Sequence, residues 1–315
     1  MEAIILNEYG AADNLQLADL EKPQIKKDEV LVKVKAISIN PVDVKSRAHD
    51  WILSWLFGEE RPVILGWDIS GVVVEKGTEV SDLVIGDEVF GMVNFFGKGN
   101  AYAEYVAVPA NQLALKPTNV SHEEAAGATL AASTAYQALV NVAKIKRGDR
   151  VLIHAASGGV GHFAVQLARY FGAYVIGTSS AKNKEFLLSL GVDEHIDYTG
   201  EGIAAIGEKV DIVIDTIAGD TLYKSIEVVR NGGIIVTLVS HDIPPSILEK
   251  AKEHGVNVEF MMVASSGETM KEIASLLYKG VVKSSIHKVF PFREMSKAHA
   301  EVETNRVVGK VIVTL

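Results

Sequence analysis

The stretch "VLIHAASGGVGHFAVQLARYFGAYVIGTSSAKN" (residues 151–183) decides the fold of the second half of the chain. It begins as an apolar strand, passes through three closely spaced glycines and ends in a second apolar strand. Between Val160 and Phe171 the apolar residues recur three and four positions apart, which predicts a helix with one apolar face. Strand, glycine turn, helix and strand in this order form the unit of a parallel sheet covered by helices.

The same alternation continues after this stretch. Apolar runs predict strands at 151–156, 174–178, 211–215, 234–239 and 257–262. Between and after them, helical patterns predict helices near 160–171, 182–190, 220–230, 245–254 and 268–279. Strands that alternate with helices predict an α/β domain with a doubly wound parallel sheet.

The first 120 residues follow a different rhythm. Short strands separated by glycine and charged turns are predicted at 29–39, 66–77, 83–93 and 101–109, which is typical of a small barrel or sandwich. The alanine-rich segment 123–143 predicts one or two helices, and the chain ends in the strand-like "GKVIVTL" (309–315). We therefore expect a β-rich domain from residues 1–122 and 285–315, with the α/β domain at 123–284 inserted between them.

Composition excludes several classes of function. The chain has 315 residues, a net charge of −9 and no cysteine, so disulfides, thiolate nucleophiles and cysteine-ligated zinc sites are excluded. The acidic balance without a basic block argues against a nucleic-acid partner. No run of about 18 apolar residues and no signal segment occurs, so we expect a soluble, cytoplasmic protein without a membrane partner.

The glycine turn has the character of a phosphate-binding loop. Glycines at a strand-to-helix junction expose backbone N–H groups at the positive end of the helix, where a pyrophosphate can bind closely. The predicted contacts are Ser157, Gly158, Gly159, Val160 and Gly161. The spacing departs from G-x-G-x-x-G because Ala156 replaces the first glycine, and a merely close-packed turn is the alternative interpretation.

The end of the second strand indicates which dinucleotide binds. A carboxylate about 20 residues after the glycines would favour an unphosphorylated ribose, but this position holds Thr178, followed by Ser179 and Ser180. Lys182 and Lys184 follow closely, and hydroxyl groups with ammonium groups suit a 2′-phosphate, which favours NADP(H) over NAD(H). Alternatively, one of the serines caps a helix and the lysines are simply solvated.

Taken in order along the chain, several motifs resemble the medium-chain dehydrogenase/reductase superfamily, in its zinc-independent quinone oxidoreductase-like or enone reductase branch. They are "SINPVDVKSR" (38–47), "PVILGWDISGVVVEKG" (62–77), "GDEVFG" (86–91), "AYAEYVAVP" (101–109), "STAYQAL" (133–139), the glycine stretch, "DIVIDTIAG" (211–219) and "GKVIVTL" (309–315). The resemblance implies a GroES-like catalytic domain, a Rossmann cofactor domain and a cleft where nicotinamide meets substrate.

The resemblance also bears on metal and substrate. Where zinc-using members of the superfamily carry cysteine and histidine ligands, this chain has Asn40 and Trp67, and no cysteine is present. Without a Lewis acid, removing hydride from an alcohol is difficult because nothing stabilises the developing alkoxide. A quinone or an α,β-unsaturated carbonyl spreads the negative charge itself, so we expect a small-molecule acceptor of this kind.

Further site residues follow from the resemblance. It places Asn40 beside the nicotinamide ribose, Thr134 at the nicotinamide end, and Ser179, Lys184 and Tyr198 at the 2′-phosphate. Three of these residues have an alternative structural role. Asn40 could form an Asx turn, Thr134 could contact its own backbone, and Tyr198 could cover the edge of the sheet. Asp43 is interpreted as a turn or capping carboxylate. The later strand ends predict contacts from Val239, Ser240, Met262 and Val263.

The substrate side is predicted from aromatic residues. An apolar pocket is expected from Trp51, Trp55, Trp67, Phe95 and Phe96, although Trp51 and Trp55 are also spaced for ordinary packing on one helix face. Two other functions stay open: an alcohol dehydrogenase, and a catalytically silent NADP(H)-binding protein such as a redox sensor. A homodimer through the sheet edge near 257–263 is a further expectation from the resemblance.

Overall fold

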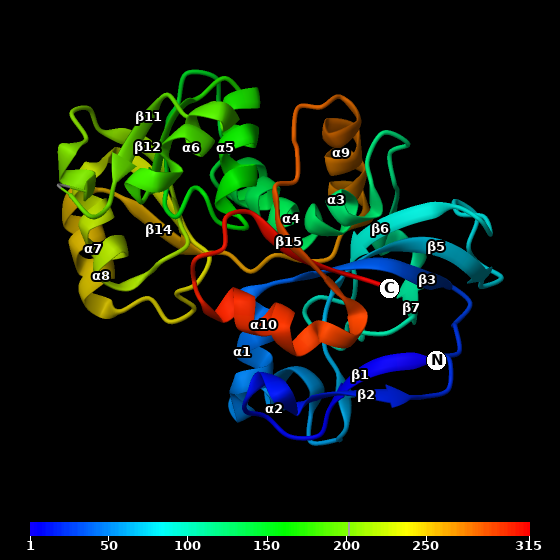
Figure 1. The fold of residues 1–315 in the computed structure, drawn as a ribbon. Coiled ribbons are helices and arrows are strands. Elements are labelled where there is room, and N and C mark those ends of the chain that lie inside the picture. Colours follow the sequence, from blue (N-terminus) through cyan, green and yellow to red (C-terminus); the bar gives the residue numbers. More distant parts are fainter. Residues whose placement is uncertain (201) are drawn as a thin grey trace. The chain divides into compact units, whose positions relative to one another are not determined.

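The computed structural model describes residues 1–200 and 202–315. Within them the chain forms two compact units, residues 1–133 with 264–315 and residues 134–263. The first unit is rich in strands, and the second alternates strands with helices (Figure 1). The mixed architecture of a GroES-like β-rich part and a Rossmann-type parallel sheet is therefore confirmed.

A six-stranded parallel sheet forms the centre of the second unit. Its strand order is β11-β10-β9-β12-β13-β14. The strands are β9 (Arg150–Ile153), β10 (Tyr174–Ser179), β11 (Glu194–Asp197), β12 (Val210–Asp215), β13 (Val229–Thr237) and β14 (Asn257–Phe260). Because the chain proceeds outward from β9 in one direction and from β12 in the other, the order reverses between these two strands, which is where such sheets bind ligands.

Helices connect the strands of this sheet. They are α5 (Gly161–Tyr170), α6 (Lys184–Leu190), α7 (Gly219–Val228) and α8 (Pro245–His254), with shorter turns η4 (Ala181–Asn183) and η5 (Gly202–Ala205). The core is continuous, since Leu152 of β9, Ile176 of β10 and Val213 of β12 are buried together with Leu222 and Ile226 of α7. Alternating strands and helices thus bury their apolar faces against one another, as the sequence pattern predicts.

The first unit contains two sheets. A three-stranded sheet has the order β2-β1-β4, and a seven-stranded sheet has the order β15-β16-β3-β5-β6-β8 with β7 paired to β3. The strands are β1 (Glu2–Leu6), β2 (Leu15–Asp19), β3 (Glu29–Ile39), β4 (Val63–Ile64), β5 (Asp68–Lys76), β6 (Glu88–Met92), β7 (Tyr105–Pro109), β8 (Ala114–Leu115), β15 (Ile286–Pro291) and β16 (Lys310–Thr314). The antiparallel pairing of β16 with β3 brings the last residues of the chain into the same sheet as residues 29–39.

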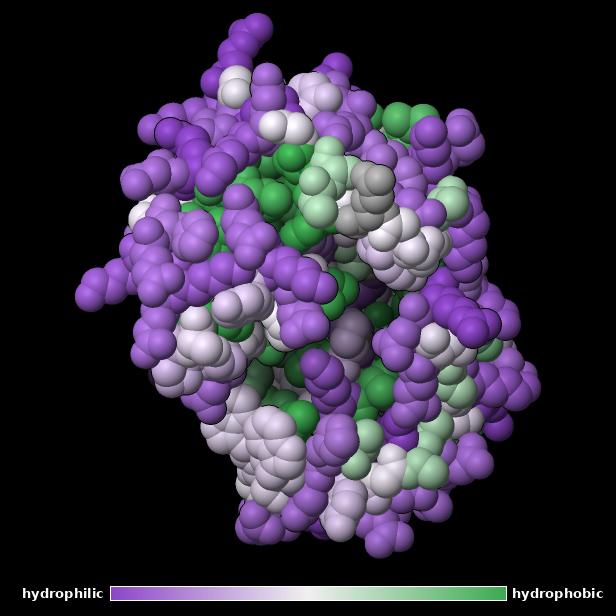
Figure 2. Space-filling view, turned by 90° about the vertical axis from the view of Figure 1, so that its left-hand side faces the viewer, coloured by the Kyte–Doolittle hydropathy of each residue, from purple (hydrophilic) through white to green (hydrophobic). Residues whose placement is uncertain are grey.

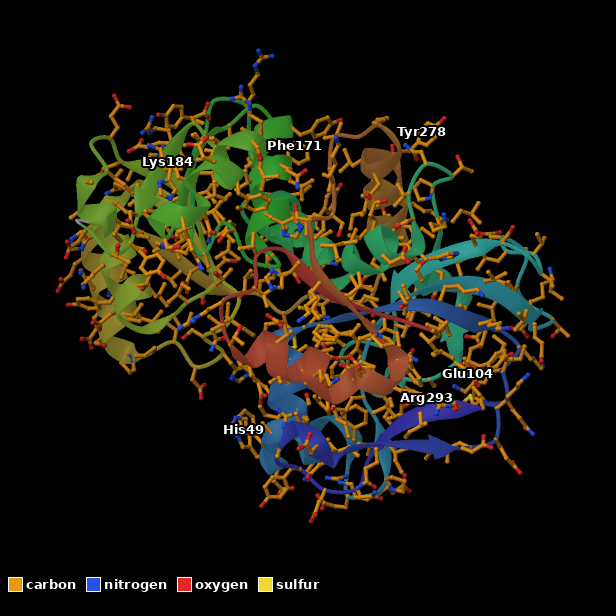
Figure 3. The ribbon with its side chains drawn as sticks, viewed as in Figure 1. His49, Glu104, Phe171, Lys184, Tyr278 and Arg293 are labelled. Atoms are coloured by element: carbon orange, nitrogen blue, oxygen red, sulfur yellow. The ribbon has the colours of Figure 1, made fainter. Side chains whose placement is uncertain are left out.

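The first unit also contains helices and short turns. They are α1 (Pro41–Ala48), α2 (Asp50–Phe57), α3 (His122–Gly127), α9 (Gly267–Tyr278) and α10 (Met295–Glu303), with the turns η1 (Ala12–Asn14), η2 (Ala110–Gln112) and η6 (Phe292–Glu294). His49 lies between α1 and α2 (Figure 3). Helix α4 (Leu130–Tyr136) and the π-helix η3 (Gln137–Val142) lie where the sequence passes from the first unit to the second.

Residues 264–284 lie in the first unit because α9 packs closely there. At Gly267, a Cβ atom would lie 2.4 Å from the backbone oxygen of Asn111, so only glycine permits this approach. The compact units therefore place 123–133 and 264–284 with the β-rich part, whereas the strand rhythm assigned 123–284 to the α/β domain. The alternation of strands and helices in the sequence does not show which of the two units a helix packs in.

The surface is mainly hydrophilic where Figure 2 shows it, with hydrophobic side chains gathered in patches among the polar ones. In the described part of the chain, no helix is both long and apolar enough to cross a membrane.

Candidate active site and cofactor cradle

The turn between β9 and α5 is shaped by close backbone contacts. Ala155 has a positive φ of 44°, and its carbonyl oxygen accepts the N–H of Gly158 at 2.8 Å. At Gly161, a Cβ atom would lie 2.3 Å from the same oxygen, so a side chain there would force the turn open. The structure thus explains why glycine is needed at the start of α5.

This turn leaves backbone donors available for an anion. Among the described residues, no acceptor contacts the backbone N–H groups of Gly159, Val160 and Gly161. They lie at the beginning of the ten-residue helix α5, where the helix dipole favours negative charge. The predicted cradle of Ser157, Gly158, Gly159, Val160 and Gly161 therefore fits the pyrophosphate of a dinucleotide.

The end of β10 is only partly as predicted. Thr178 is buried, and its hydroxyl oxygen accepts the backbone N–H of Ala155 at 3.3 Å, so this residue serves the turn. Ser179 Oγ donates to the backbone oxygen of Ser180 at 3.0 Å. The side chain of Ser180 precedes η4 without capping it, so the predicted serine cap is not formed there.

The two lysines of this segment are exposed. Lys184 begins α6 (Figure 3), and neither Lys182 nor Lys184 forms an ion pair within the described residues. Asn183, between them, donates to Ser157 Oγ at 3.0 Å and so links this segment to the glycine turn. Both ammonium groups are therefore available to an anionic ligand beside the cradle.

The neighbouring strand β11 adds residues that the sequence did not single out. His195 Nε2 lies 2.9 Å from Ser179 Oγ, and Asp197 is paired with Ser179 in the sheet register. Hydrogen bonds from Thr199 lower the pKa of Asp197 and hold its Oδ1 in its own turn. Tyr198 is 65% exposed, so it contributes little to covering the edge of the sheet.

The remaining cofactor candidates occupy the predicted elements. Val239 and Ser240 follow β13, and Met262 and Val263 follow β14, at the carboxyl ends of neighbouring parallel strands. Val239 and Met262 are partly exposed, whereas Val263 is buried. Thr134 is buried in α4.

Asn40 lies in a buried cluster of charged groups in the first unit. Its Nδ2 donates to Asp68 Oδ2 at 2.8 Å, and the ammonium of Lys310 donates to its Oδ1. Asp43 Oδ2 accepts the backbone N–H of Asn40 at 2.6 Å, as the capping interpretation predicts. Asp68 of β5 and Lys310 of β16 thus meet at the side-chain amide of Asn40, Asp43 of α1 holds its backbone N–H, and all four residues are buried.

This arrangement fixes the orientation of the amide. An ammonium has only donors and an ionised carboxylate has only acceptors, so the oxygen of Asn40 faces Lys310 and its nitrogen faces Asp68. The second hydrogen on Nδ2 has no acceptor within the described residues. Because Asn40 is only 1% exposed, the surrounding residues position it tightly.

The cluster contains two carboxylates and one ammonium. Burial, and after it the nearby carboxylate of Asp68, raises the pKa of Asp43 to about 7. Burial also raises the pKa of Asp68 and lowers the pKa of Lys310, and the attraction between these two opposes both shifts. With a pKa of about 7, the buried carboxyl of Asp43 is only partly ionised at neutral pH.

The aromatic candidates form a connected series from surface to core. The ring of Trp55 lies 4.3 Å from that of Phe96, Phe96 lies 5.2 Å from Phe95, and Phe95 lies 5.3 Å from Trp67. Trp67 is fully buried and its Nε1 donates to the backbone oxygen of Gly97 at 2.7 Å. Trp51 is 69% exposed, so helix-face packing does not account for it.

A zinc ion of the kind that some superfamily members use does not fit this unit. The two corresponding positions hold Asn40, whose amide is engaged by Lys310 and Asp68, and Trp67, which has no ligand atom for a metal. In the described ranges, no group of three or more histidine, cysteine, aspartate or glutamate residues is placed to hold a metal.

Sequence reasoning missed Asp68, Lys310, Asn183 and His195. Asp68 and Lys310 are far apart in sequence from Asn40, and only the pairing of β3 with β5 and β16 brings them together. A lysine beginning the apolar strand "KVIVT" is a weak signal of a buried ammonium, because strand-end lysines are usually solvated.

The pKa of Asp43 gives a prediction about stability. Because its folded pKa of about 7 exceeds the unfolded value of about 4, wild-type stability should fall as pH rises from about 4 to about 7. Asp43→Asn should remove this part of the slope, on the order of 4 kcal/mol across that window, while keeping an acceptor for the Asn40 N–H. Urea unfolding at several pH values measures it. Asp13→Asn, an exposed control, should keep the wild-type slope, and an unchanged slope in Asp43→Asn would contradict the assignment.

Comparison with known proteins agrees with both halves of the chain. The alcohol dehydrogenase GroES-like domain family matches residues 26–118, and the zinc-binding dehydrogenase family matches residues 190–313. The second description names a metal for the family, although the positions discussed above do not supply its ligands here.

Relatives and solved structures match along nearly the whole chain. The NADPH-dependent alkenal/one oxidoreductase of Arabidopsis thaliana chloroplasts is 35% identical over 99% of this chain and 79% of the relative. The 2-methylene-furan-3-one reductase of Solanum lycopersicum is 36% identical with the same coverage.

Two solved structures extend the likeness to three dimensions. The quinone oxidoreductase of Coxiella burnetii has a TM-score of 0.93 and 34% identity, covering 100% of this chain and 99% of that one. The Escherichia coli quinone oxidoreductase complexed with NADPH has a TM-score of 0.87 and 26% identity, covering 100% of both chains. The chain thus belongs to the medium-chain dehydrogenase/reductase superfamily, among its quinone oxidoreductase and enone reductase members.

Proposed function

We propose that the protein is a zinc-independent, NADPH-dependent reductase of quinones or of α,β-unsaturated carbonyls. The observation that carries this proposal is the cradle of backbone N–H groups, which have no acceptor among the described residues, beside two exposed lysines that form no ion pair with any described residue. NADPH supplies a hydride when it is bound, and the protein's residues hold and orient it. The names of relatives that are about 35% identical support both the cofactor and the acceptor class.

The proposed contacts follow the cofactor from one end to the other. Ser157 to Gly161 hold the pyrophosphate, and Ser179, Ser180, Lys184 and Tyr198 contact the 2′-phosphate. Asn40 and Thr134 serve the nicotinamide end, and Val239, Ser240, Met262 and Val263 line the cofactor along the strand ends. Asn40 is the proposed catalytic residue, because its amide carries a fixed N–H donor next to opposite buried charges.

The proposed chemistry needs no metal. Hydride addition to the β-carbon of an enone places negative charge on an enolate, which the acceptor delocalises, and a proton from solvent then completes the reduction. Zinc-independence is supported by Asn40 and Trp67 at the positions where zinc ligands would be needed. An alcohol dehydrogenase would lack the Lewis acid that stabilises an alkoxide.

The aromatic series is the proposed substrate wall. Trp51, Trp55 and Phe96 are exposed. Phe95 and Trp67 lie behind Phe96 in the connected series, whereas no ring contact joins Trp51 to it among the described residues. Two hydrogen bonds with Ser265, from the Phe95 N–H to Ser265 Oγ and from the Ser265 N–H to the Phe95 oxygen, hold this segment in place. An apolar wall of this kind suits acceptors with alkyl or aromatic groups.

The remaining assignments concern domains, location and assembly. We assign residues 1–122 and 285–315 to the catalytic domain and 123–284 to the cofactor domain, in a cytoplasmic protein without nucleic-acid or membrane partners.

A homodimer is proposed through β14, the edge strand of the six-stranded sheet. Light scattering should then give twice the chain mass of 33.9 kDa, and the single-chain mass would reject the dimer.

A panel of acceptors tests the proposed function. NADPH and NADH oxidation should be followed with quinones, 2-alkenals of increasing chain length, vinyl ketones and simple aldehydes. We expect turnover of quinones or of conjugated carbonyls with NADPH, and a KM that falls as the alkyl chain lengthens against the aromatic wall. Turnover of unconjugated aldehydes alone would favour an alcohol dehydrogenase. Binding of NADPH without any turnover would favour a silent sensor.

Lys184 should determine the preference for the phosphorylated cofactor. Because an exposed ammonium can pair with a 2′-phosphate, Lys184→Ala should raise KM for NADPH about fivefold to tenfold and leave KM for NADH within about twofold. Lys252→Ala, which removes an exposed lysine from α8, is the matched control and should change neither value. Equal effects on both cofactors would contradict the assignment of Lys184 to the phosphate.

A further inference from the structure

A chain of buried hydrogen bonds runs beneath the glycine turn in the second unit. His154 follows β9 and is 2% exposed. Its Nε2 lies 2.8 Å from Ser225 Oγ on α7, and its Nδ1 lies 3.3 Å from Thr178 Oγ1 on β10. Thr178 Oγ1 in turn accepts the backbone N–H of Ala155, which enters the turn.

The contacts at each end fix the direction of every hydrogen bond in this network. Ser225 Oγ donates its single hydrogen to the backbone oxygen of Thr221 at 2.7 Å, so it can only accept from His154. Nε2 therefore carries the hydrogen of the neutral ring, and Nδ1 is an acceptor. The hydroxyl of Thr178 must then donate to Nδ1, which turns its lone pair toward the N–H of Ala155.

The surroundings keep this ring neutral. Burial lowers the pKa of His154 to about 4, and the opposing attraction of Asp215 on β12 is the weaker effect. Asp215 Oδ1 is engaged by the backbone N–H groups of Ile217 and Ala218. The hydroxyl groups of Thr178 and Ser225 are the other polar groups bonded to the ring. Nδ1 is thus free of a proton at neutral pH.

The Ala155 peptide is where this chain meets the cradle. Its N–H is held by the Thr178 hydroxyl, and its oxygen accepts Gly158 and lies against Gly161. With a φ of 44°, Ala155 occupies a region that is unfavourable for a residue with a side chain, so a contact is needed to hold it there. A peptide that rotates at this point would displace both glycines.

We propose that neutral His154 is a positioning residue which orients the Thr178 hydroxyl and thereby holds the Ala155 peptide and the glycine turn in the shape that receives a pyrophosphate. This inference rests on the proposed function, because it concerns the same cofactor cradle. It assigns the residue no contact with the cofactor. The effect should be common to NADPH and NADH, since both carry the pyrophosphate.

Four variants test the inference, with cofactor affinity measured by fluorescence titration and stability by urea unfolding. Thr178→Val removes the hydroxyl at nearly constant shape. His154→Asn keeps an acceptor near the Nδ1 position, whereas His154→Gln keeps only the reach toward Ser225. Ser225→Ala removes the far end of the network but keeps Nδ1 and the Thr178 hydroxyl. Because Thr178 Oγ1 still accepts the Ala155 N–H, its hydrogen can still be donated to Nδ1, and the variant serves as the stability control.

Thr178→Val and His154→Gln should raise Kd for NADPH and NADH by the same factor, about fivefold to tenfold, which corresponds to one lost hydrogen bond. His154→Asn should stay within about twofold of wild type. Ser225→Ala should lose stability without a comparable loss of affinity. The kcat at saturating NADPH should change little, so the effect should appear in KM.

Three results would overturn the inference. Unchanged affinities in Thr178→Val and His154→Gln would show that the turn does not need this chain. Affinity that falls in proportion to stability in every variant, Ser225→Ala included, would reduce His154 to a general structural role. If wild type binds neither nucleotide, the proposed function itself fails and the inference fails with it, which distinguishes the two.

Discussion

The ammonium of Lys310, buried against the amide of Asn40, is the interaction on which the β-rich unit depends. A lysine loses much of its hydration on burial, and only acceptors and opposite charge can offset that cost. Here the acceptors are the Asn40 amide and the backbone oxygen of Ile39, and the opposite charge comes mainly from Asp68. Burying Lys310 therefore requires β3, β5 and β16 to meet, although they are far apart along the chain.

The burial of Lys310 also fixes the orientation of the Asn40 amide. Asn40 would be an ordinary turn residue if its amide could rotate, but ammonium on one side and carboxylate on the other leave one orientation. Buried hydrogen bonds also fix a group at the glycine turn of the second unit, where Thr178 and a neutral histidine hold a backbone peptide in place. In both units, buried polar contacts fix a group that a flexible chain would leave free to rotate.

Sequence patterns predicted the long apolar strands closely and the short polar ones less well. The run 29–39 was predicted as a strand and forms β3 with the same bounds, because its apolar alternation is long and free of breaks. Strand β11 was not predicted, because "EHID" is mostly polar and shows little apolar pattern. In the structure only one of its four residues is fully buried. Helix α1 was read as a turn because the Asn-Pro start dominated the pattern, although proline is favoured in the first turn of a helix.

The residues of the candidate site also differ in how far the sequence could show them. The glycine turn was visible because its chemistry lies in one continuous segment. The partners of Asn40 were not, since Asp68 and Lys310 reach it only through strand pairing. Thr178 looked like a ligand hydroxyl from its distance to the glycines, but spacing does not tell which side of a strand end a side chain takes.

A double-mutant cycle on the Asn40 cluster tests whether the buried charges hold its amide as a unit. Unfolding free energies should be measured for Lys310→Met, Asp68→Asn and the double variant. Lys310→Met leaves the buried carboxylate of Asp68 without its ammonium and should cost about 3–5 kcal/mol. If the charges hold the amide as a unit, the double variant should be more stable than the sum of the single losses by at least about 1 kcal/mol. Losses that add to within about 0.5 kcal/mol would contradict the account.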